Sequence, residues 1–470
     1  MFRNPYVIVH TPFCTHTPVY LLEATMDLSQ HNREFLNKLV IRKELDLDDD
    51  SYDCQECYRF WNSEDVLEWF SNKGYTLYGR VAQDNYLPSG TDPQLPYPKF
   101  QEYDYPYSCH NAQPVDGGEP SLTGDDTTGR IVYAQDSHGR HVAIKATRKE
   151  SNEYSILRFL NQQNMEVLQE NCILPVLEFL PYDDSCFIVM PRWGTSIQHP
   201  VQFRTLRDTL CFMQSALKAL TFLHSHNIIH RDVSLPNFVI NHFGHSSCTR
   251  FFAYSLTRRH ELSKKKVTYA MIDFDLAKML PGDMKREDCR LPSYESFVGS
   301  YGPADTSQGE FEYNPFVYDV GSLGVMFCDE YQHYTKDIPL LAPFLDRMVT
   351  KNLQRRFTAA EGLRFVERII LESKESQLST SEYRDPEYGL FTFETYDRWK
   401  SLPADFQMKW SAYREPVGIP FSSKILRAIV ASVWLPEFLI PKIRKMTFKV
   451  LSIPRGIWAQ CFRFASYLRE

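Results

Sequence analysis

The sequence predicts an α+β fold in which a small, β-rich lobe precedes a larger helical lobe, with an extension at each end. Strand patterns gather between residues 130 and 190, whereas helical patterns dominate from 203 to 374. Strands that precede the helices, rather than alternating with them, are typical of the α+β class. The length of 470 residues also exceeds that of one ordinary domain, which leaves chain for the two extensions.

The small lobe is predicted from short apolar runs. Residues 130–134 and 140–145 have strand patterns, and the polar segment 136–139, which ends in glycine, predicts the turn of a hairpin between them. A helical pattern follows at 150–163, and the apolar run 186–190 predicts a short buried strand.

The large lobe is predicted from four helical patterns. They lie at 203–226, 315–332, 337–350 and 358–374. Near the start of the chain, Ser63 precedes two acidic residues and an apolar pattern, which predicts a helix capped by Ser63. Residues 84–116 are rich in Pro, Gly, Tyr and Asp without clear periodicity, and this predicts a loop or linker.

These patterns divide the chain into four segments. Residues 1–116 form a Tyr- and Pro-rich N-terminal extension, 117–374 the two-lobed domain, 375–420 a linker or an extension of the large lobe, and 421–470 a basic apolar tail. The tail carries nine Lys or Arg residues against two Glu residues, a local net charge of +7.

The tail allows two interpretations. Its apolar run at 425–435 is too short and too interrupted, by Arg427 and Pro436, for a membrane-spanning helix. A helix lying on a membrane surface is one alternative, because Trp residues and basic residues accompany the run. Docking onto the acidic remainder of the chain is the other.

The composition limits which classes of partner and which cellular compartment are expected. A net charge of −7 argues against a general nucleic-acid binder. The 11 cysteines are scattered, and no apolar run like that of a signal peptide follows Met1, so reduced thiols in the cytoplasm or nucleus are expected. Cys54 and Cys57 form a C-x-x-C pair without a second pair at zinc spacing, so plain thiols are favoured over a metal site.

A loop after the first long helix carries the chemistry. In His230-Arg231-Asp232, the carboxylate of Asp232 suits a base that accepts or orients the proton of an attacking hydroxyl. Asn237 follows five positions later, and its amide oxygen is a suitable Mg²⁺ ligand. This spacing, between a helix and the apolar run 238–240, predicts a site of phosphoryl transfer.

Three further stretches complete this constellation. Asp273 ends an apolar strand and is the second predicted metal ligand. Lys145 ends Val-Ala-Ile-Lys, where alternation places Ala143 on the same face, so the ammonium can reach nucleotide phosphates while Ala143 packs on adenine. Glu153 begins a helix with one apolar side and is predicted to hold Lys145 in an ion pair, although a solvated helix carboxylate is the plain alternative.

The remaining predicted nucleotide contacts lie on either side of these residues. Gly124 and Gly129 keep the outer glycines of a phosphate-covering loop, but Asp126 takes the middle position, and a plain hairpin turn explains the stretch almost as well. Met190 precedes Pro191, which has no N–H, so the backbone donor to adenine is expected from Trp193. The full set of predicted cofactor-binding residues is Gly124, Gly129, Ile131, Ala143, Lys145, Met190, Trp193 and Val239.

These residues resemble the eukaryotic protein kinase family over residues 118–370. The resemblance implies a bilobal protein-kinase-like fold, ATP and Mg²⁺ as cofactors, and Ser or Thr hydroxyls of a protein as acceptors. It also implies that the helix containing Gly321-Ser-Leu-Gly324 anchors the catalytic loop from below, and that Arg356 is a late structural arginine. The strings His-Arg-Asp-Val-Ser, Tyr-Asn-Pro-Phe and Asp-Phe-Asp further resemble the expanded kinase-like proteins of mushroom-forming fungi.

Several positions depart from the family pattern. Ser234 stands where a lysine that contacts the γ-phosphate is usual, and Asp275 stands where a flexible glycine is usual. No clean Ala-Pro-Glu motif appears, so the stretch 303–305 is a substitute in which Asp305, or else Glu310 or Glu312, pairs with Arg356. An active protein kinase and an ATP-binding pseudokinase that serves as an interaction module therefore both remain as hypotheses.

Overall fold

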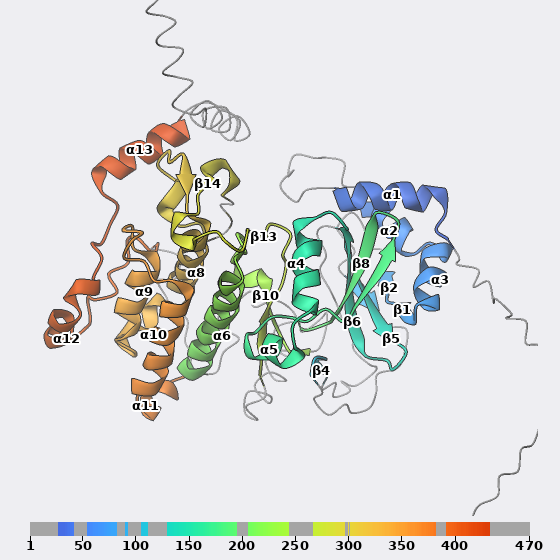
Figure 1. The fold of residues 1–470 in the computed structure, drawn as a ribbon. Coiled ribbons are helices and arrows are strands. Elements are labelled where there is room, and N and C mark those ends of the chain that lie inside the picture. Colours follow the sequence, from blue (N-terminus) through green and yellow to red (C-terminus); the bar gives the residue numbers. More distant parts are fainter. Residues whose placement is uncertain are drawn as a thin grey trace, which may run out of the picture.

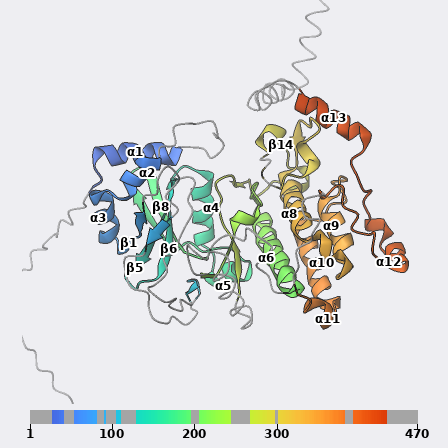
Figure 2. The same ribbon diagram turned by 180° about the vertical axis from the view of Figure 1, so that it is seen from behind.

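In the computed structural model, the description covers residues 27–41, 54–81, 90–92, 105–110, 129–194, 205–243, 267–296, 299, 301–381 and 392–432. These residues form two lobes. The smaller is built on one sheet and the larger on helices, as Figure 1 and the reverse view in Figure 2 show. The predicted bilobal α+β class is confirmed.

The small lobe contains a five-stranded antiparallel sheet. Its strands, in spatial order, are β1 (Tyr75–Leu77), β5 (Ile131–Asp136), β6 (His141–Arg148), β8 (Ser185–Pro191) and β7 (Glu178–Tyr182). The predicted hairpin is β5 and β6, and its turn is closed by the Asp136 carboxylate, which accepts from the backbone N–H groups of His138 and Arg140 at 2.9 Å each. Gly139 has φ 73°, which only glycine adopts without strain.

The first strand of the sheet comes from the predicted N-terminal extension. β1 pairs with β5, although the chain between them runs from residue 78 to residue 130. The described residues of this connection contain three short strands. They are β2 (Gly79–Val81), β3 (Gly90–Asp92) and β4 (Cys109–His110). The boundary placed at 116/117 stays a prediction, but the small lobe clearly draws on residues before it.

Three helices of the same extension cover the face of the sheet away from the large lobe (Figure 1). They are α1 (Gln30–Ile41), α2 (Cys54–Trp61) and α3 (Glu64–Asn72). An aromatic core joins them to the sheet, because Trp61, Trp69 and Phe70 each pack their rings within about 6 Å of Phe187 in β8. Burying several aromatic side chains is strongly stabilising, so these helices belong to the lobe.

The cap predicted for α3 is not formed as expected. The helix begins at Glu64, but the hydroxyl of Ser63 donates to the carbonyl of Phe60 at 2.7 Å and makes no capping hydrogen bond. The same hydroxyl accepts from Asn32 of α1 at 2.9 Å. Ser63 therefore links α1 and α2 instead of capping α3.

The other face of the sheet carries the predicted helix, α4 (Asn152–Asn161), and the short α5 (Met165–Glu170) follows it. Beyond them, the large lobe packs four main helices, which correspond to the four predicted patterns. They are α6 (Leu206–Ser225), α8 (Pro315–Tyr331), α9 (Leu341–Val349) and α10 (Ala359–Glu372). Capping boxes begin α6, at Thr205 and Asp208, and α10, at Thr358 and Glu361.

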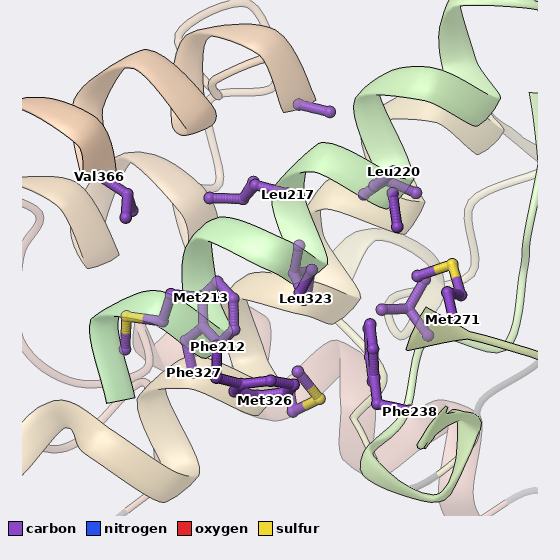
Figure 3. Close-up of a cluster of buried hydrophobic side chains, with 14 of the residues drawn as sticks. Phe212, Met213, Leu217, Leu220, Phe238, Met271, Leu323, Met326, Phe327 and Val366 are labelled. Atoms are coloured by element: carbon purple, nitrogen blue, oxygen red, sulfur yellow. The ribbon is translucent and has the colours of Figure 1, made fainter. Parts of the chain in front are cut away.

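The core of the large lobe lies between these helices. Figure 3 shows Leu217 and Leu220 of α6 beside Leu323 of α8, with Phe238 and Met271 close by. All five side chains are buried. The core thus fixes α6 and α8 against the strands that carry the catalytic loop.

In the described part of the large lobe, seven short strands lie around and after that loop. They are β9 (Ile228–Ile229), β10 (Phe238–Ile240), β11 (His242–Phe243), β12 (Tyr269–Met271), β13 (Lys278–Met279), and β14 (Leu291–Pro292), which pairs with β15 (Glu312–Tyr313). β9 pairs with β13, and β10 with β12. The catalytic loop therefore begins after β9 and ends at β10, with the segment from Asp273 onward alongside.

The chain after α10 continues over the large lobe. Its helices are α11 (Glu375–Leu378), α12 (Ala404–Lys409) and α13 (Phe421–Ser432). Trp399 and Trp410 enter the main core from this region. Among the described residues, no helix combines the length and the apolar character needed to cross a membrane.

Candidate active site

The catalytic loop is anchored by a buried aspartate of α8. Asp319, which is 0% exposed, accepts from the backbone N–H of His230 and of Arg231, at 2.8 Å each, and from His224 Nε2 at 3.1 Å. His230 Nε2 in turn donates to the carbonyl of Ile272 at 3.1 Å. The predicted support of the loop by this helix is confirmed, and it also ties the loop to the residue before Asp273.

Asp232 is oriented by its own loop. Asn237 Nδ2 donates to the Asp232 carboxylate at 2.8 Å and to its backbone carbonyl at 2.9 Å. Burial raises the pKa of the Asp232 carboxyl above its ordinary value, and Asp273 acts in the same direction, whereas His230 and the hydrogen bonds from Asn237 and Ser234 lower it. Ser234 thus contributes a hydroxyl at the position where the resemblance would place a lysine.

Lys145 connects the two lobes electrostatically. Its ammonium lies 2.7 Å from Glu153 Oε1 and 2.9 Å from Asp273 Oδ1. Although burial lowers the pKa of Lys145, the carboxylates of Asp273, Asp275 and Glu153 outweigh it and raise the pKa well above the ordinary value. The predicted Lys145–Glu153 ion pair is present, so Glu153 is not a solvated helix carboxylate.

A cation that the sequence reading missed, Arg130, compensates Asp275. Its guanidinium forms a two-pronged ion pair with the Asp275 carboxylate, which also lies 3.2 Å from Lys145 Nζ. Both side chains of the Arg130 pair are largely buried, at 8% and 11% exposed. The signal was in the sequence, since an arginine directly after Gly129 and an acidic residue two positions after Asp273 are complementary in charge.

The predicted nucleotide contacts on the sheet share one face. Ile131 lies opposite Lys145, and Ala143 lies opposite Met190, in the antiparallel register. Because directly opposed residues share a face and alternate residues repeat it, these four side chains form one surface. Val239 of β10 packs in one apolar cluster with Met190 and Trp193. The structure therefore brings these predicted residues together.

Residues 106 and 108, which lie in the stretch predicted as a loop or linker, contact the segment 191–193 that joins the lobes. Trp193 Nε1 donates to the carbonyl of Pro106 at 2.7 Å, and Ser108 Oγ donates to the carbonyl of Arg192 at 2.8 Å. The Arg192 N–H donates to the carbonyl of His141 in β6. The backbone groups of Pro191 therefore point away from β6, because successive residues of a strand direct their backbone groups to opposite sides. That orientation suits a carbonyl available to adenine.

The phosphate-covering loop is described only at its end. Gly124 and Asp126 lie outside the described residues, whereas Gly129 has φ 74° and its carbonyl accepts from Trp61 Nε1 at 2.7 Å. The connection between the first two strands of the sheet begins at residue 78, so it is much longer than the stretch 124–129. The helical extension thus contacts the nucleotide side of the lobe directly.

The predicted metal ligands offer a suitable donor set. Asn237 uses its amide nitrogen on Asp232, which leaves its oxygen for a cation, and Asp273 presents a carboxylate nearby. Oxygen ligands of this kind are those that Mg²⁺ prefers. Asp273 has φ 66°, an uncommon conformation for a non-glycine residue, and such strain is typical of functional positions.

Of the three acidic residues predicted as partners of Arg356, Asp305 forms the ion pair. Arg356 Nη1 and Nη2 donate to the Asp305 carboxylate at 2.6 and 2.7 Å, and both side chains are almost fully buried. Gly321 permits this arrangement, because a Cβ at that position would clash with the Arg356 guanidinium. The predicted pairing of Arg356 is confirmed.

Comparisons with known proteins agree with this geometry. Residues 121–330 match the family described as the protein kinase domain. A probable serine/threonine-protein kinase of Dictyostelium discoideum is 26% identical over 257 residues, which are 52% of this chain and 36% of that protein. The serine/threonine-protein kinase US3 homolog of Varicella-zoster virus is 29% identical over 109 residues, 22% of this chain and 26% of that protein.

A third relative, cyclin-dependent kinase D-1 of Oryza sativa subsp. indica, is 27% identical over 128 residues, 25% of this chain. The matches span 36%, 26% and 30% of the lengths of these three curated relatives. The bilobal fold, the anchored catalytic loop and the family match agree over the same residues. The chain therefore contains a protein kinase domain.

Proposed function

We propose that this protein transfers the γ-phosphoryl group of ATP to Ser or Thr hydroxyls of a protein substrate. The observation that carries the proposal is the convergence of Asp232, Asn237, Asp273 and the Lys145–Glu153 ion pair at one place between the lobes. Phosphoryl transfer needs mainly positioning and charge stabilisation from the protein. The serine/threonine kinase names of two of the relatives support a hydroxyl acceptor.

Each residue has a defined task in this proposal. Asp232 accepts the proton of the acceptor hydroxyl, and Asn237 holds its carboxylate in place. Lys145, positioned by Glu153, donates to the α and β phosphates of the nucleotide. Asp273 and Asn237 would hold Mg²⁺, which would supply charge neutralisation at the transferred group.

The test is ATP turnover with Mg²⁺ in wild type, Lys145→Met and Asp232→Ala. Loss of a general base typically lowers the rate by about 10²- to 10⁴-fold, so Asp232→Ala should lose at least about 100-fold. Lys145→Met removes a cation from the phosphates, and loss of one such stabilising group costs about 10²- to 10³-fold. Matched controls are Lys149→Met and Asp283→Ala, which change exposed or half-buried residues of the same types outside the site. Turnover that persists in Asp232→Ala would contradict the proposal.

A second candidate function is an ATP-binding pseudokinase that acts as an interaction module. It is favoured by the sharing of Lys145 among three carboxylates, by Asp275, and by Ser234 in place of a lysine. This function predicts that ATP raises the melting temperature while no phosphate is transferred. Robust autophosphorylation of purified protein would exclude it.

For the tail, we propose that its first helix docks on the kinase body. Arg427 of α13 donates to both oxygens of Glu394 at 2.6 and 3.0 Å, and Lys351 lies 2.8 Å from the same carboxylate. Residues 433–470 lie outside the described residues, so a peripheral membrane contact stays a prediction. Liposome co-sedimentation that is unchanged by deletion of 421–470 would contradict that contact.

Two narrower assignments also remain proposals. The strings at 230–234, 273–275 and 313–316 support membership of the kinase-like proteins expanded in mushroom-forming fungi, and a survey of that group in which these strings do not recur would contradict it. The scattered cysteines support the cytoplasm or nucleus, and Cys172, Cys186, Cys211, Cys289 and Cys328 are free thiols. Secretion of a tagged full chain would contradict this compartment.

A further inference from the structure

In its described residues, the segment that follows Asp273 is held at three places. Its β13 pairs with β9, directly before the catalytic loop, and its β14 pairs with β15. Near its far end, Asp305 is held by Arg356. In protein kinases such a segment must be ordered for catalysis, and a phosphoryl group paired with Arg commonly orders it.

In this protein one glutamate gathers the contacts at the middle of the segment. The Glu295 carboxylate forms an ion pair with Lys278 of β13. Its backbone carbonyl accepts from Arg231 of the catalytic loop and from the hydroxyl of Tyr313 in β15, the latter at 3.4 Å. Arg231 Nη1 also donates to the carbonyl of Leu276 at 3.0 Å. Glu295 thus connects β13, the catalytic loop and β15.

The charges around Glu295 suit an acidic residue at this position. Lys278 and Arg231 place two cations beside this part of the segment, and the Glu295 carboxylate faces one of them. Phosphoryl groups order loops by pairing with such cations. Glu295 supplies a permanent negative charge beside Lys278, where a phosphoryl group would otherwise pair with the cation.

The hydroxyl group of the neighbouring Ser293 is poorly placed to receive a phosphoryl group. Ser293 is 2% exposed, and Ser296 Oγ donates to the carbonyl of Ser293 at 2.7 Å and lies 3.1 Å from Thr306 Oγ1. A side chain must reach solvent to enter another kinase's active site. The buried Ser293 hydroxyl therefore cannot enter another kinase's active site.

We propose that Glu295 is a positioning residue whose carboxylate orders the segment permanently, so that the domain is assembled without phosphorylation of that segment. This inference rests on the proposed phosphoryl transfer and names its regulation. Because Lys278 and Glu295 are 29% and 25% exposed, the pair contributes to local order more than to global stability.

The experiment uses the full chain, treated with phosphatase and shown by intact mass to carry no phosphate. Hydrogen exchange over residues 276–296 and ATP turnover are compared in wild type, Glu295→Gln, Glu295→Asp and the charge exchange Lys278→Glu with Glu295→Lys. The control is Glu287→Gln, which alters an exposed glutamate of the same segment.

We expect phosphatase to leave wild-type turnover unchanged. Glu295→Gln should accelerate exchange over 276–296 by about tenfold and lower kcat by a similar factor, since a charge-assisted hydrogen bond is lost. The exchanged pair should recover most of the protection, and Glu287→Gln should match wild type. Recovery of protection in the charge-exchange variant would show that the ion pair orders the segment. If Glu295 acted only through its shape, exchanging the two charges would not restore the protection.

Two results would overturn the inference. One is exchange in Glu295→Gln that equals that of Glu287→Gln, and the other is wild-type turnover that disappears with phosphatase. If wild type transfers no phosphate at all, the proposed function fails, whereas the exchange comparison still decides the role of Glu295. The two failures are therefore distinguishable.

Discussion

At the residue scale, Asp275 places a negative charge close to where nucleotide phosphates would bind. Arg130 and Lys145 balance it. The charge is compensated within the protein, so the departure from glycine does not by itself disable the site. It does introduce competition, because Lys145, one of the two cations beside Asp275, is the residue that the proposed function assigns to the nucleotide phosphates.

This competition predicts opposite effects of Asp275→Asn on stability and on nucleotide affinity. Removing one partner of a largely buried ion pair costs about 3–5 kcal/mol, so the melting temperature should fall by several degrees. Removing the negative charge also strengthens the attraction of Lys145 and Arg130 for phosphates, so ATP should bind about three- to tenfold more tightly. Calorimetry and thermal unfolding measure the two effects, with the exposed Asp184→Asn as the control. Weaker ATP binding would contradict this account.

Asp232 predicts a pH dependence of catalysis. Because burial raises the pKa of its carboxyl, kcat/KM should fall with decreasing pH at values above the ordinary Asp pKa of about 3.9. Ser234→Ala removes a hydrogen bond that lowers this pKa, so the acidic limb should move to higher pH. Pre-steady-state turnover between pH 4 and pH 8 checks the shift, with Ser155→Ala on the exposed side of α4 as the control. An acidic limb that does not shift in Ser234→Ala would show that Ser234 does not affect the pKa of Asp232.

At the scale of elements, local signals in the sequence predicted more than distant pairings. The hairpin of β5 and β6, the helices α6, α8 and α10, and the catalytic loop all follow from periodicity, turns and spacing within short windows. β1 did not, since three residues carry little pattern and their partner strand begins more than fifty residues later. For the same reason, the contacts of Arg130 and of residues 105–108 could not be predicted, because their partners are far away in sequence.

The helices α1 to α3 are predicted to affect nucleotide binding through one hydrogen bond. Trp61 Nε1 donates to the carbonyl of Gly129, next to Arg130. Trp61→Phe keeps most of the ring packing but removes this donor, so the KM for ATP should rise by about three- to tenfold, as expected for loss of a buried hydrogen bond. Trp69→Phe is a matched control, because Trp69 packs on the same Phe187 and has no described hydrogen bond from its indole. Equal KM values for the two variants would contradict the coupling.

At the scale of the whole molecule, the large lobe extends past residue 374. Trp399 Nε1 and Arg398 Nη1 both donate to the buried Asp346 of α9, at 2.7 and 2.8 Å. Trp410 packs with its ring 5.7 Å from that of Phe365 in α10. Of the two interpretations of the segment 375–420, these contacts favour an extension of the lobe over a free linker.

This extension predicts where the chain can be shortened. Truncation after residue 374 removes two buried tryptophans, each worth about 3–5 kcal/mol when truncated, and strips Asp346 of its charged partner for about 3–5 kcal/mol more. That sum is comparable with the whole stability of a domain, about 5–15 kcal/mol, so the shortened protein should not fold. Truncation after residue 432 keeps every one of these contacts and should preserve both the melting temperature and ATP binding. Circular dichroism during heating and calorimetry compare the two forms. A cooperative unfolding transition in the protein that ends at 374 would show that the lobe is stable without these contacts, and that the boundary of the domain lies where the sequence alone placed it.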